Sequence, residues 1–135
     1  MKLVDYDLFE LVACARQAGA CESALVDFEP ISSMAEALDH ERAAFWLSWY
    51  AHRILRARWV EAEPVISRDP ECAYLYALYV VRGRWEEAET TIGSDPRWAC
   101  AYARDVTRSR WLDVETVIAK SRQWWQVYRE HFVFG

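Results

Sequence analysis

The chain has 135 residues, of which 15% are aromatic, and its formal net charge at neutral pH is −5. This length suits one domain with a hydrophobic core, and the mild negative charge argues against a basic nucleic-acid-binding surface. No apolar run approaches the ~18 residues of a membrane span, and acids interrupt the apolar start of the chain, which excludes a secretory signal. We therefore expect a cytoplasmic protein with no membrane segment.

The first part of the chain, residues 1–38, has the pattern of a cap made of helices. A first helix is expected over Lys2–Ala18, ended by Gly19, with shorter helices over Cys21–Phe28 and Ser33–Leu38. Asp39 then stands where the N-cap of a longer helix would lie. Residues 39–58 are interpreted as the long helix of a degenerate repeat whose first half has diverged.

Residues 59–135 contain three copies of a 26-residue repeat. Trp59, Trp85 and Trp111 open the copies at equal spacing, and a fixed period of this length is typical of stacked-repeat proteins. A single copy of this length cannot bury its own apolar side, whereas stacked copies can bury the apolar sides of their neighbours. The three Trp side chains are therefore predicted to be equivalent and mostly buried.

Each copy reads as a hairpin of two helices. The short helix, Glu61–Ser67 in the first copy, carries apolar residues four apart. Asp69 and Pro70 then start a second helix, because Asp accepts hydrogen bonds from the free N–H groups of a first turn and Pro suits its first position. This helix is predicted to reach Arg82 and to end at Gly83 in the left-handed conformation.

These elements predict an all-α fold: a short right-handed solenoid of stacked helical hairpins with a divergent N-terminal cap, forming a single domain over residues 1–135. The pattern RWxEAExxIxxDPxxAxxYA, from Arg58 to Tyr128 with a weaker echo from Trp46, resembles the tandem helical repeats of proteins from bacteriophages and some bacteria. The resemblance implies a viral or mobile-element setting. It implies no reaction, since the pattern contains no known catalytic residues.

Charged residues recur with the same period and form two Arg rows in the sequence. The first Arg row is Arg56, Arg82 and Arg108, and the second Arg row is Arg58, Arg84 and Arg110. Carboxylates recur beside them, so one interpretation is Arg–carboxylate pairing between neighbouring hairpins, which would fix the register of the repeats. The other is a charged strip that binds a partner or an anionic ligand.

The last helix contains Trp124 and Trp125, more apolar area than a terminal helix usually exposes. They either seal the end of the stack or form a docking patch. We include both residues with the two Arg rows as candidate partner-binding residues.

No catalytic site or metal site is expected. His40 and Glu41 begin like the zinc motif HExxH, but Ala44 stands where the second His would be. The four Cys show no ligand spacing, and no cofactor-binding loop is visible.

We therefore expect a non-catalytic protein–protein interaction module whose partner is another protein. One alternative is a phage-encoded inhibitor that binds a host defence protein. A further alternative is a small-ligand binder or an enzyme that uses the Arg rows. Self-association into a homo-oligomer is left open.

Overall fold

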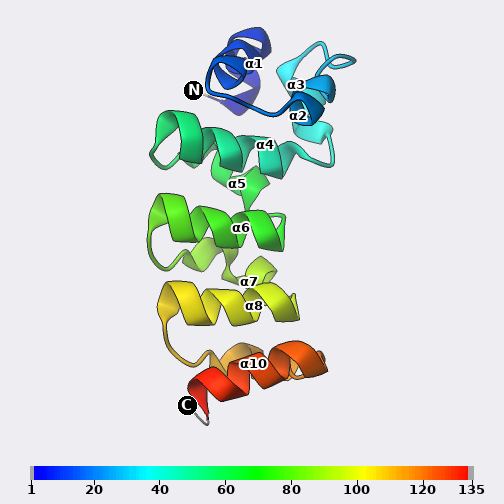
Figure 1. Cartoon of the computed structure of the whole chain (residues 1–135). Helices are drawn as coiled ribbons and strands as arrows, with labels where there is room; N and C mark the ends of the chain where they lie inside the picture. Colours follow the sequence, from blue (N-terminus) through cyan, green and yellow to red (C-terminus); the bar gives the residue numbers. More distant parts are fainter. Residues whose placement is uncertain (1, 134–135) are drawn as a thin grey trace. The chain divides into compact units, whose positions relative to one another are not determined.

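The computed structural model describes residues Lys2–Val133, and every regular element in that range is a helix. The chain forms two compact units, Met1–Ile66 and Ser67–Gly135, which can be followed by colour in Figure 1. The predicted all-α fold with repeated hairpins is confirmed. The handedness of a solenoid and the single domain stay predictions.

The N-terminal unit combines short helices with one longer helix. Labels with η denote 3-10 or π-helical turns, here and below. Its elements are η1 (Leu3–Asp5), α1 (Leu8–Gln17), α2 (Glu22–Val26), α3 (Met34–Asp39), α4 (Ala43–Tyr50), η2 (Ala51–Leu55), η3 (Val60–Ala62) and α5 (Glu63–Ile66). Helix α4 packs against α5 and α3, and α3 packs against η1.

The prediction of one helix over Lys2–Ala18 was wrong, because Asp7 starts a new helix. The Asp7 carboxylate accepts hydrogen bonds from the backbone N–H groups of Phe9 at 3.0 Å and Glu10 at 3.4 Å. It therefore acts as the N-cap of α1, as Asp does where a chain enters a helix from an extended conformation. Gly19 has φ +91° just beyond α1, which confirms its predicted place at the helix end.

Asp39 was also assigned wrongly, since it is the last residue of α3 and not the cap of α4. The reason lies at the start of α3, where Ser33 accepts a hydrogen bond from the N–H of Glu36, and the Glu36 carboxylate accepts one from the N–H of Ser32 at 2.7 Å. This reciprocal arrangement is a capping box in which the Glu36 side chain binds the N–H of Ser32, one residue before the capping Ser33. Helix α3 thus occupies nearly the predicted range but includes Asp39, and α4 begins only at Ala43.

The C-terminal unit contains three long helices. The second and third each follow a short helix and form a complete hairpin of the repeat with it. We call α6 with η4, α8 with η6, and α10 the long helices, and η5 with α7 and η7 with α9 the short helices. Their bounds are α6 (Pro70–Tyr76), η4 (Ala77–Val81), η5 (Glu86–Ala88), α7 (Glu89–Ile92), α8 (Pro96–Tyr102), η6 (Ala103–Thr107), η7 (Leu112–Val114), α9 (Glu115–Ile118) and α10 (Arg122–Phe132).

The start of each long helix is set by its side-chain cap, as the sequence predicts. Asp69 accepts from the N–H of Cys72 at 2.9 Å, and Asp95 accepts from the N–H groups of Arg97 and Trp98. Ser121 takes this place before α10, accepting from the N–H of Trp124. Each cap satisfies a backbone donor that the helix itself leaves free.

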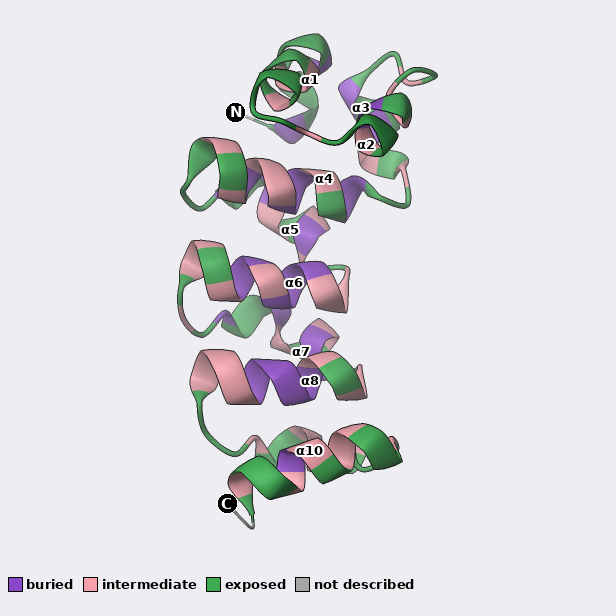
Figure 2. Cartoon of the chain, in the orientation of Figure 1, coloured by how far each residue is buried: buried purple, intermediate pink, exposed green. Residues whose placement is uncertain are grey.

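The core lies between the long helices and the short ones. Helix α8 packs beside both α6 and α10, and Figure 2 shows buried residues across much of α8 but few on α10. Trp85 is 2% exposed, with its ring centroid 4.8 Å from that of Tyr76. In the N-terminal unit Trp59 is buried against Tyr50 in the same way, whereas Trp111 is only half-buried against Tyr102. The predicted burial is thus confirmed for two of the three.

Candidate partner-binding surface

The first Arg row stands at a backbone feature that the sequence did not indicate. Helices α4, α6 and α8 each run into a π-helical turn. The residue after each turn is an Arg in the left-handed conformation: Arg56, Arg82 and Arg108, with φ of 52°, 60° and 54°. Gly83, predicted to hold that position, does not. The prediction was one residue out because the wider π turn ends the helix earlier in the sequence.

The π turn ends on one shared acceptor. The carbonyl oxygen of Ala77 accepts from the N–H of Arg82 and also from the N–H of Gly83 at 3.2 Å. Ala103 does the same for Arg108 and Ser109. These bonds satisfy the helix end and hold a residue with a Cβ in a conformation that L-residues rarely adopt.

The side chains of Arg82 and Arg108 are exposed. Neither forms an ion pair with any carboxylate in the part of the chain that the structure describes. An exposed guanidinium with no internal partner keeps its donors available for another molecule. Arg56 has the same backbone setting and exposure in the N-terminal unit.

The second Arg row has a different role, because it is used internally. Arg84 binds the carboxylate of Glu89 through two hydrogen bonds of 2.7 and 3.1 Å, and Arg110 binds Glu115 through two of 3.0 and 2.9 Å. In the N-terminal unit Arg58 makes the same pair with Glu63. The two partners of each pair are five positions apart in the sequence, so the pair lies within one hairpin and does not join neighbouring hairpins.

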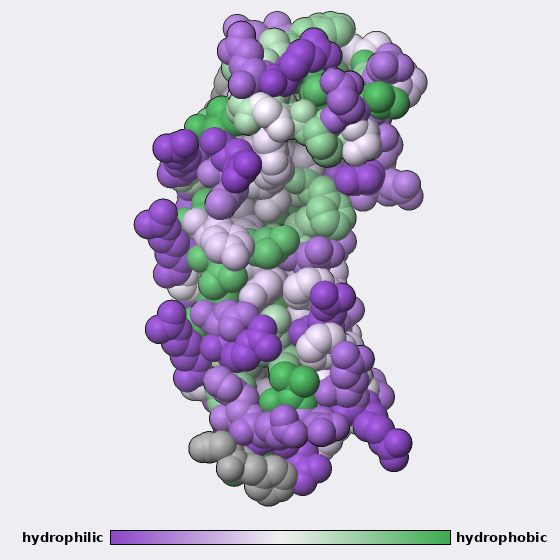
Figure 3. Space-filling model, viewed as in Figure 1, coloured by the Kyte–Doolittle hydropathy of each residue, from purple (hydrophilic) through white to green (hydrophobic). Residues whose placement is uncertain are grey.

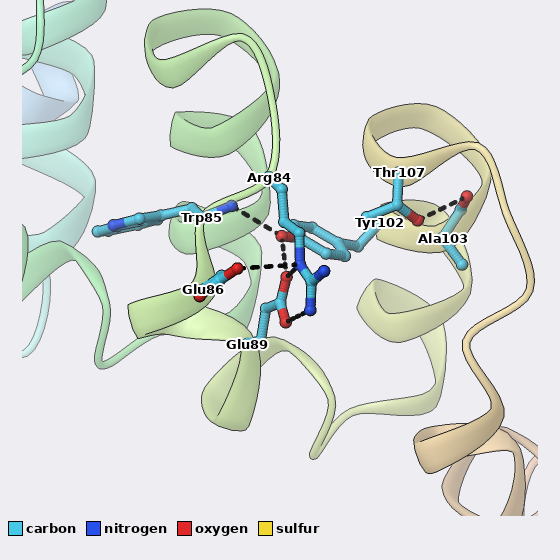
Figure 4. A network of polar contacts seen from close by, with 7 residues as sticks. All are labelled: Arg84, Trp85, Glu86, Glu89, Tyr102, Ala103 and Thr107. Atoms are coloured by element: carbon cyan, nitrogen blue, oxygen red, sulfur yellow. Dashed lines mark hydrogen bonds and ion pairs between the residues drawn. The ribbon is translucent and has the colours of Figure 1, made fainter.

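A Tyr side chain joins the short helix of each hairpin to the long helix of the same hairpin. The Tyr102 hydroxyl, from α8, donates to Glu89 at 2.7 Å and accepts from the backbone N–H of Trp85 at 2.9 Å (Figure 4). Tyr128 on α10 repeats both bonds with Glu115 and the N–H of Trp111. Tyr therefore fixes the two helices of one hairpin against each other, and the paired Arg holds the carboxylate in place.

The pKa values in this network reflect the same contacts. Burial by itself would raise the pKa of Glu89, but the hydrogen bonds from Arg84 and Tyr102 outweigh it and the pKa lies below its ordinary value. The bond from Arg110 is the main reason that the pKa of Glu115 is also lowered. Burial, together with donation to Glu89, raises the pKa of Tyr102. The Glu side chains are therefore ionised and the Tyr hydroxyl is neutral near neutral pH.

Sequence reasoning missed a second polar network on the long helices. The Tyr74 hydroxyl donates to Asp105 at 2.5 Å, and Arg104 binds the same carboxylate at 2.8 and 3.0 Å. The bond from Arg104 is the main reason that the pKa of Asp105 lies below its ordinary value. The available signal was a departure from the repeat, because these residues replace unrelated ones in the neighbouring copies, namely Cys100, Leu78 and Tyr79.

Trp124 and Trp125 are half-buried and pack against the last core cluster, around Ile118 and Tyr128. Trp125 stacks on Tyr128 with centroids 5.6 Å apart, at the position of Ala99 in the preceding copy. The Trp124 ring lies under the Arg97 guanidinium, 5.6 Å from its centroid. The contacts of both rings are those of residues that cover a core. Their part in binding a partner stays a prediction.

Comparisons with protein-family models, curated proteins and solved structures found no match to this chain. Among the residues described, no helix is both long and apolar enough to span a bilayer, and no three His, Cys, Asp or Glu side chains converge on a common point.

Proposed function

We propose that this chain is a non-catalytic module that binds another protein. The supporting observation is the contrast between the two Arg rows in the C-terminal unit. Arg84 and Arg110 are paired with carboxylates, whereas Arg82 and Arg108 stand exposed, without an ion pair to any described residue, at equivalent positions of successive repeats. Repeated surface positions of one charge suit an extended protein partner, as in other repeat proteins.

The setting we propose is the cytoplasm of a bacterial or phage-infected cell. The repeat pattern resembles repeats from phages and bacteria, and Cys14, Cys21, Cys72 and Cys100 are all free thiols, which suits a reducing compartment. A bacterial lysate is therefore the source in which to look for the partner.

The test is affinity capture from that lysate, followed by titration of the purified partner by calorimetry. The variant bait carries Arg56→Glu, Arg82→Glu and Arg108→Glu, and the matched control carries Arg16→Glu, Arg68→Glu and Lys120→Glu, which are also exposed and change the net charge equally. We expect one protein at near-equal molar amount with the wild type and the control, and its loss with the variant.

A partner retained equally by all three baits would contradict the assignment to the first Arg row. Absence of any near-stoichiometric protein from every bait would contradict the proposed function itself. Circular dichroism of each bait shows whether it has kept its helices, so that misfolding is not read as loss of binding.

A further inference from the structure

The charges of the C-terminal unit are segregated between its long and short helices. The long helices and the Arg that follows each of the first two, residues 70–82, 96–108 and 122–132, hold six Arg against three carboxylates. The remaining residues, 67–69, 83–95 and 109–121, hold four basic residues against seven carboxylates. The unit is neutral as a whole, but its long-helix side is positive.

Internal contacts leave this imbalance in place. Of the three carboxylates on the long helices, Asp105 is bound by Arg104 and Tyr74, and Glu130 accepts from Gln126. By contrast, Arg82, Arg97 and Arg108 are exposed and pair with no carboxylate among Lys2–Val133. The charges left for a partner on this side are therefore mainly positive.

One apolar position recurs in the three long helices, and we call the residues at this position the apolar band. Leu75 on α6, Ala101 on α8 and Val127 on α10 occupy equivalent positions of successive copies. Leu75 and Val127 are half-buried and Ala101 is 8% exposed, so the band is shallower at α8. Figure 3 shows hydrophobic side chains within this face, with hydrophilic ones gathered at the edge where η4 and η6 end.

Aromatic rings border the band near the N-terminal ends of the long helices. Trp98 is half-buried, with its ring centroid 5.4 Å from that of Tyr74. The Arg97 guanidinium lies 4.6 Å from the centroid of Trp98 and 5.6 Å from that of Trp124. Contact with two ring faces restrains this cation before any partner arrives, which reduces the entropy lost on binding.

We infer that the face of α6, α8 and α10 binds an acidic segment of a partner protein, with apolar side chains on the band and carboxylates at Arg82, Arg97 and Arg108. This inference rests on the proposed function and adds the face and the chemistry of the partner. Helices pack roughly 8–10 Å apart, so three of them extend over about 20 Å. About 13 helical residues or about six extended residues cover that distance.

The test uses a displayed library of random 16-residue peptides selected on the immobilised full chain. Enriched peptides are synthesised with a fluorophore, and their affinities are measured by anisotropy in low and high salt. We expect sequences that combine Asp or Glu with Leu, Phe or Trp, and affinities that fall as salt rises. Enrichment of basic or uncharged sequences would overturn the inference.

Two pairs of substitutions locate the peptide. Arg82→Glu with Arg108→Glu is expected to weaken binding at least tenfold, whereas Arg68→Glu with Lys120→Glu, an equal charge change outside the long helices, is expected to change it less than twofold. Equal effects of the two pairs would overturn the assigned face. Circular dichroism confirms that all variants remain helical.

A single substitution separates the apolar band from general charge attraction. Leu75→Lys adds a positive charge but removes an apolar contact, so we expect affinity for the acidic peptide to fall by about fivefold or more. Tighter binding by this variant would show that charge alone attracts the peptide and would overturn the proposed role of the apolar band in binding.

A parallel titration with the oligonucleotide dT16 tests another polyanion, and tighter binding of dT16 than of any peptide would also overturn the inference. Failure of the inference can be told from failure of the proposed function. If no peptide is enriched while lysate capture still yields a stoichiometric partner, the partner's chemistry is wrong and the binding function stands. If both experiments are negative, both proposals fall.

Discussion

At the scale of single residues, the most informative group is the Tyr hydroxyl that joins the two helices of one hairpin. Tyr102 satisfies the N–H of Trp85 and helps to fix the ionised form of Glu89. A buried donor that loses its partner is destabilising even where the pair itself contributes modestly. One hydroxyl oxygen therefore both sets the position of the long helix against the short helix and pairs with these two polar groups.

Tyr102→Phe is expected to lower the free energy of unfolding by about 1–3 kcal/mol, since it leaves the N–H of Trp85 without its acceptor. Urea denaturation followed by circular dichroism measures the change. Tyr79→Phe is the matched control, because Tyr79 is 53% exposed and water can replace contacts of its hydroxyl. An effect of Tyr102→Phe no larger than that of the control would contradict the structural role of this network.

The lowered pKa of Glu89 and Glu115 predicts a loss of stability in acid. The ordinary pKa of Glu is near 4.5 and the folded values lie below it, so the unfolded chain binds more protons in this range. The stabilisation is thus fully present above about pH 5 and is lost as pH falls through the folded pKa values.

We expect Glu89→Gln and Glu115→Gln together to flatten the dependence of unfolding free energy on pH between pH 5 and pH 3. Exposed Glu86 and Glu87, changed to Gln, serve as controls. A slope that is unchanged in the double variant, or that flattens equally in the control, would show that other carboxylates govern the acid response.

At the scale of elements, two of the long helices, α6 with η4 and α8 with η6, end in a π turn and not at a glycine. The wider turn brings the N–H groups of Arg82 and Gly83 to the same carbonyl oxygen, that of Ala77. It also sets an Arg at the left-handed position, where a residue with a Cβ is strained by roughly 1–2 kcal/mol. Ending the helix in this way places the guanidinium outside the core.

Substitutions at Arg82 should reveal this strain. Arg82→Gly is expected to leave stability unchanged or raise it by up to about 1 kcal/mol, because Gly adopts positive φ freely. Arg82→Val is expected to be destabilising by about 1–2 kcal/mol, since a β-branched residue tolerates this conformation poorly.

The matched control is Arg97→Gly in the first turn of α8, where Gly is expected to be destabilising by about 0.5–1 kcal/mol. Thermal unfolding of the three variants measures the order. If Gly were as harmful at residue 82 as at residue 97, the left-handed conformation of Arg82 would be contradicted.

At the scale of the whole molecule, the two compact units each depend on Trp–Tyr contacts of the same kind. In the C-terminal unit, Trp85 packs on Tyr76, and Trp111 packs on Tyr102. Tyr128 finds its ring partners on its own helix, in Trp125 and Phe132. These replace the smaller residues Ala99 and Val106 of the preceding copy.

Trp85→Ala is expected to be destabilising by about 3–5 kcal/mol, because the indole is 2% exposed and its removal leaves a cavity. Trp111→Ala should have a smaller effect, since Trp111 is half-buried. Calorimetric unfolding of both variants tests this order. Equal losses would show that the two copies are packed alike.

The sequence by itself determined the helical class, the 26-residue period and the starts of the long helices in the C-terminal unit. These follow from local signals: Asp or Ser at a cap, Pro at a first position and apolar residues at helical spacing. A cap needs only its own next few residues, so its effect can be inferred without knowing the fold. The misplaced cap at Asp39 shows the limit, since a competing cap at Ser33 lies close by.

Only the tertiary structure decided which Arg side chains pair with carboxylates and which form no ion pair among the described residues. Arg82 and Arg84 are two residues apart and equally periodic, yet one ends a π turn in solvent and the other binds Glu89. That difference depends on a Tyr from the long helix of the same hairpin, which also binds Glu89, and on the backbone path between helices. Such contacts join residues 13 to 31 positions apart, and no local pattern specifies them, because the geometry that creates them exists only once the hairpins have packed.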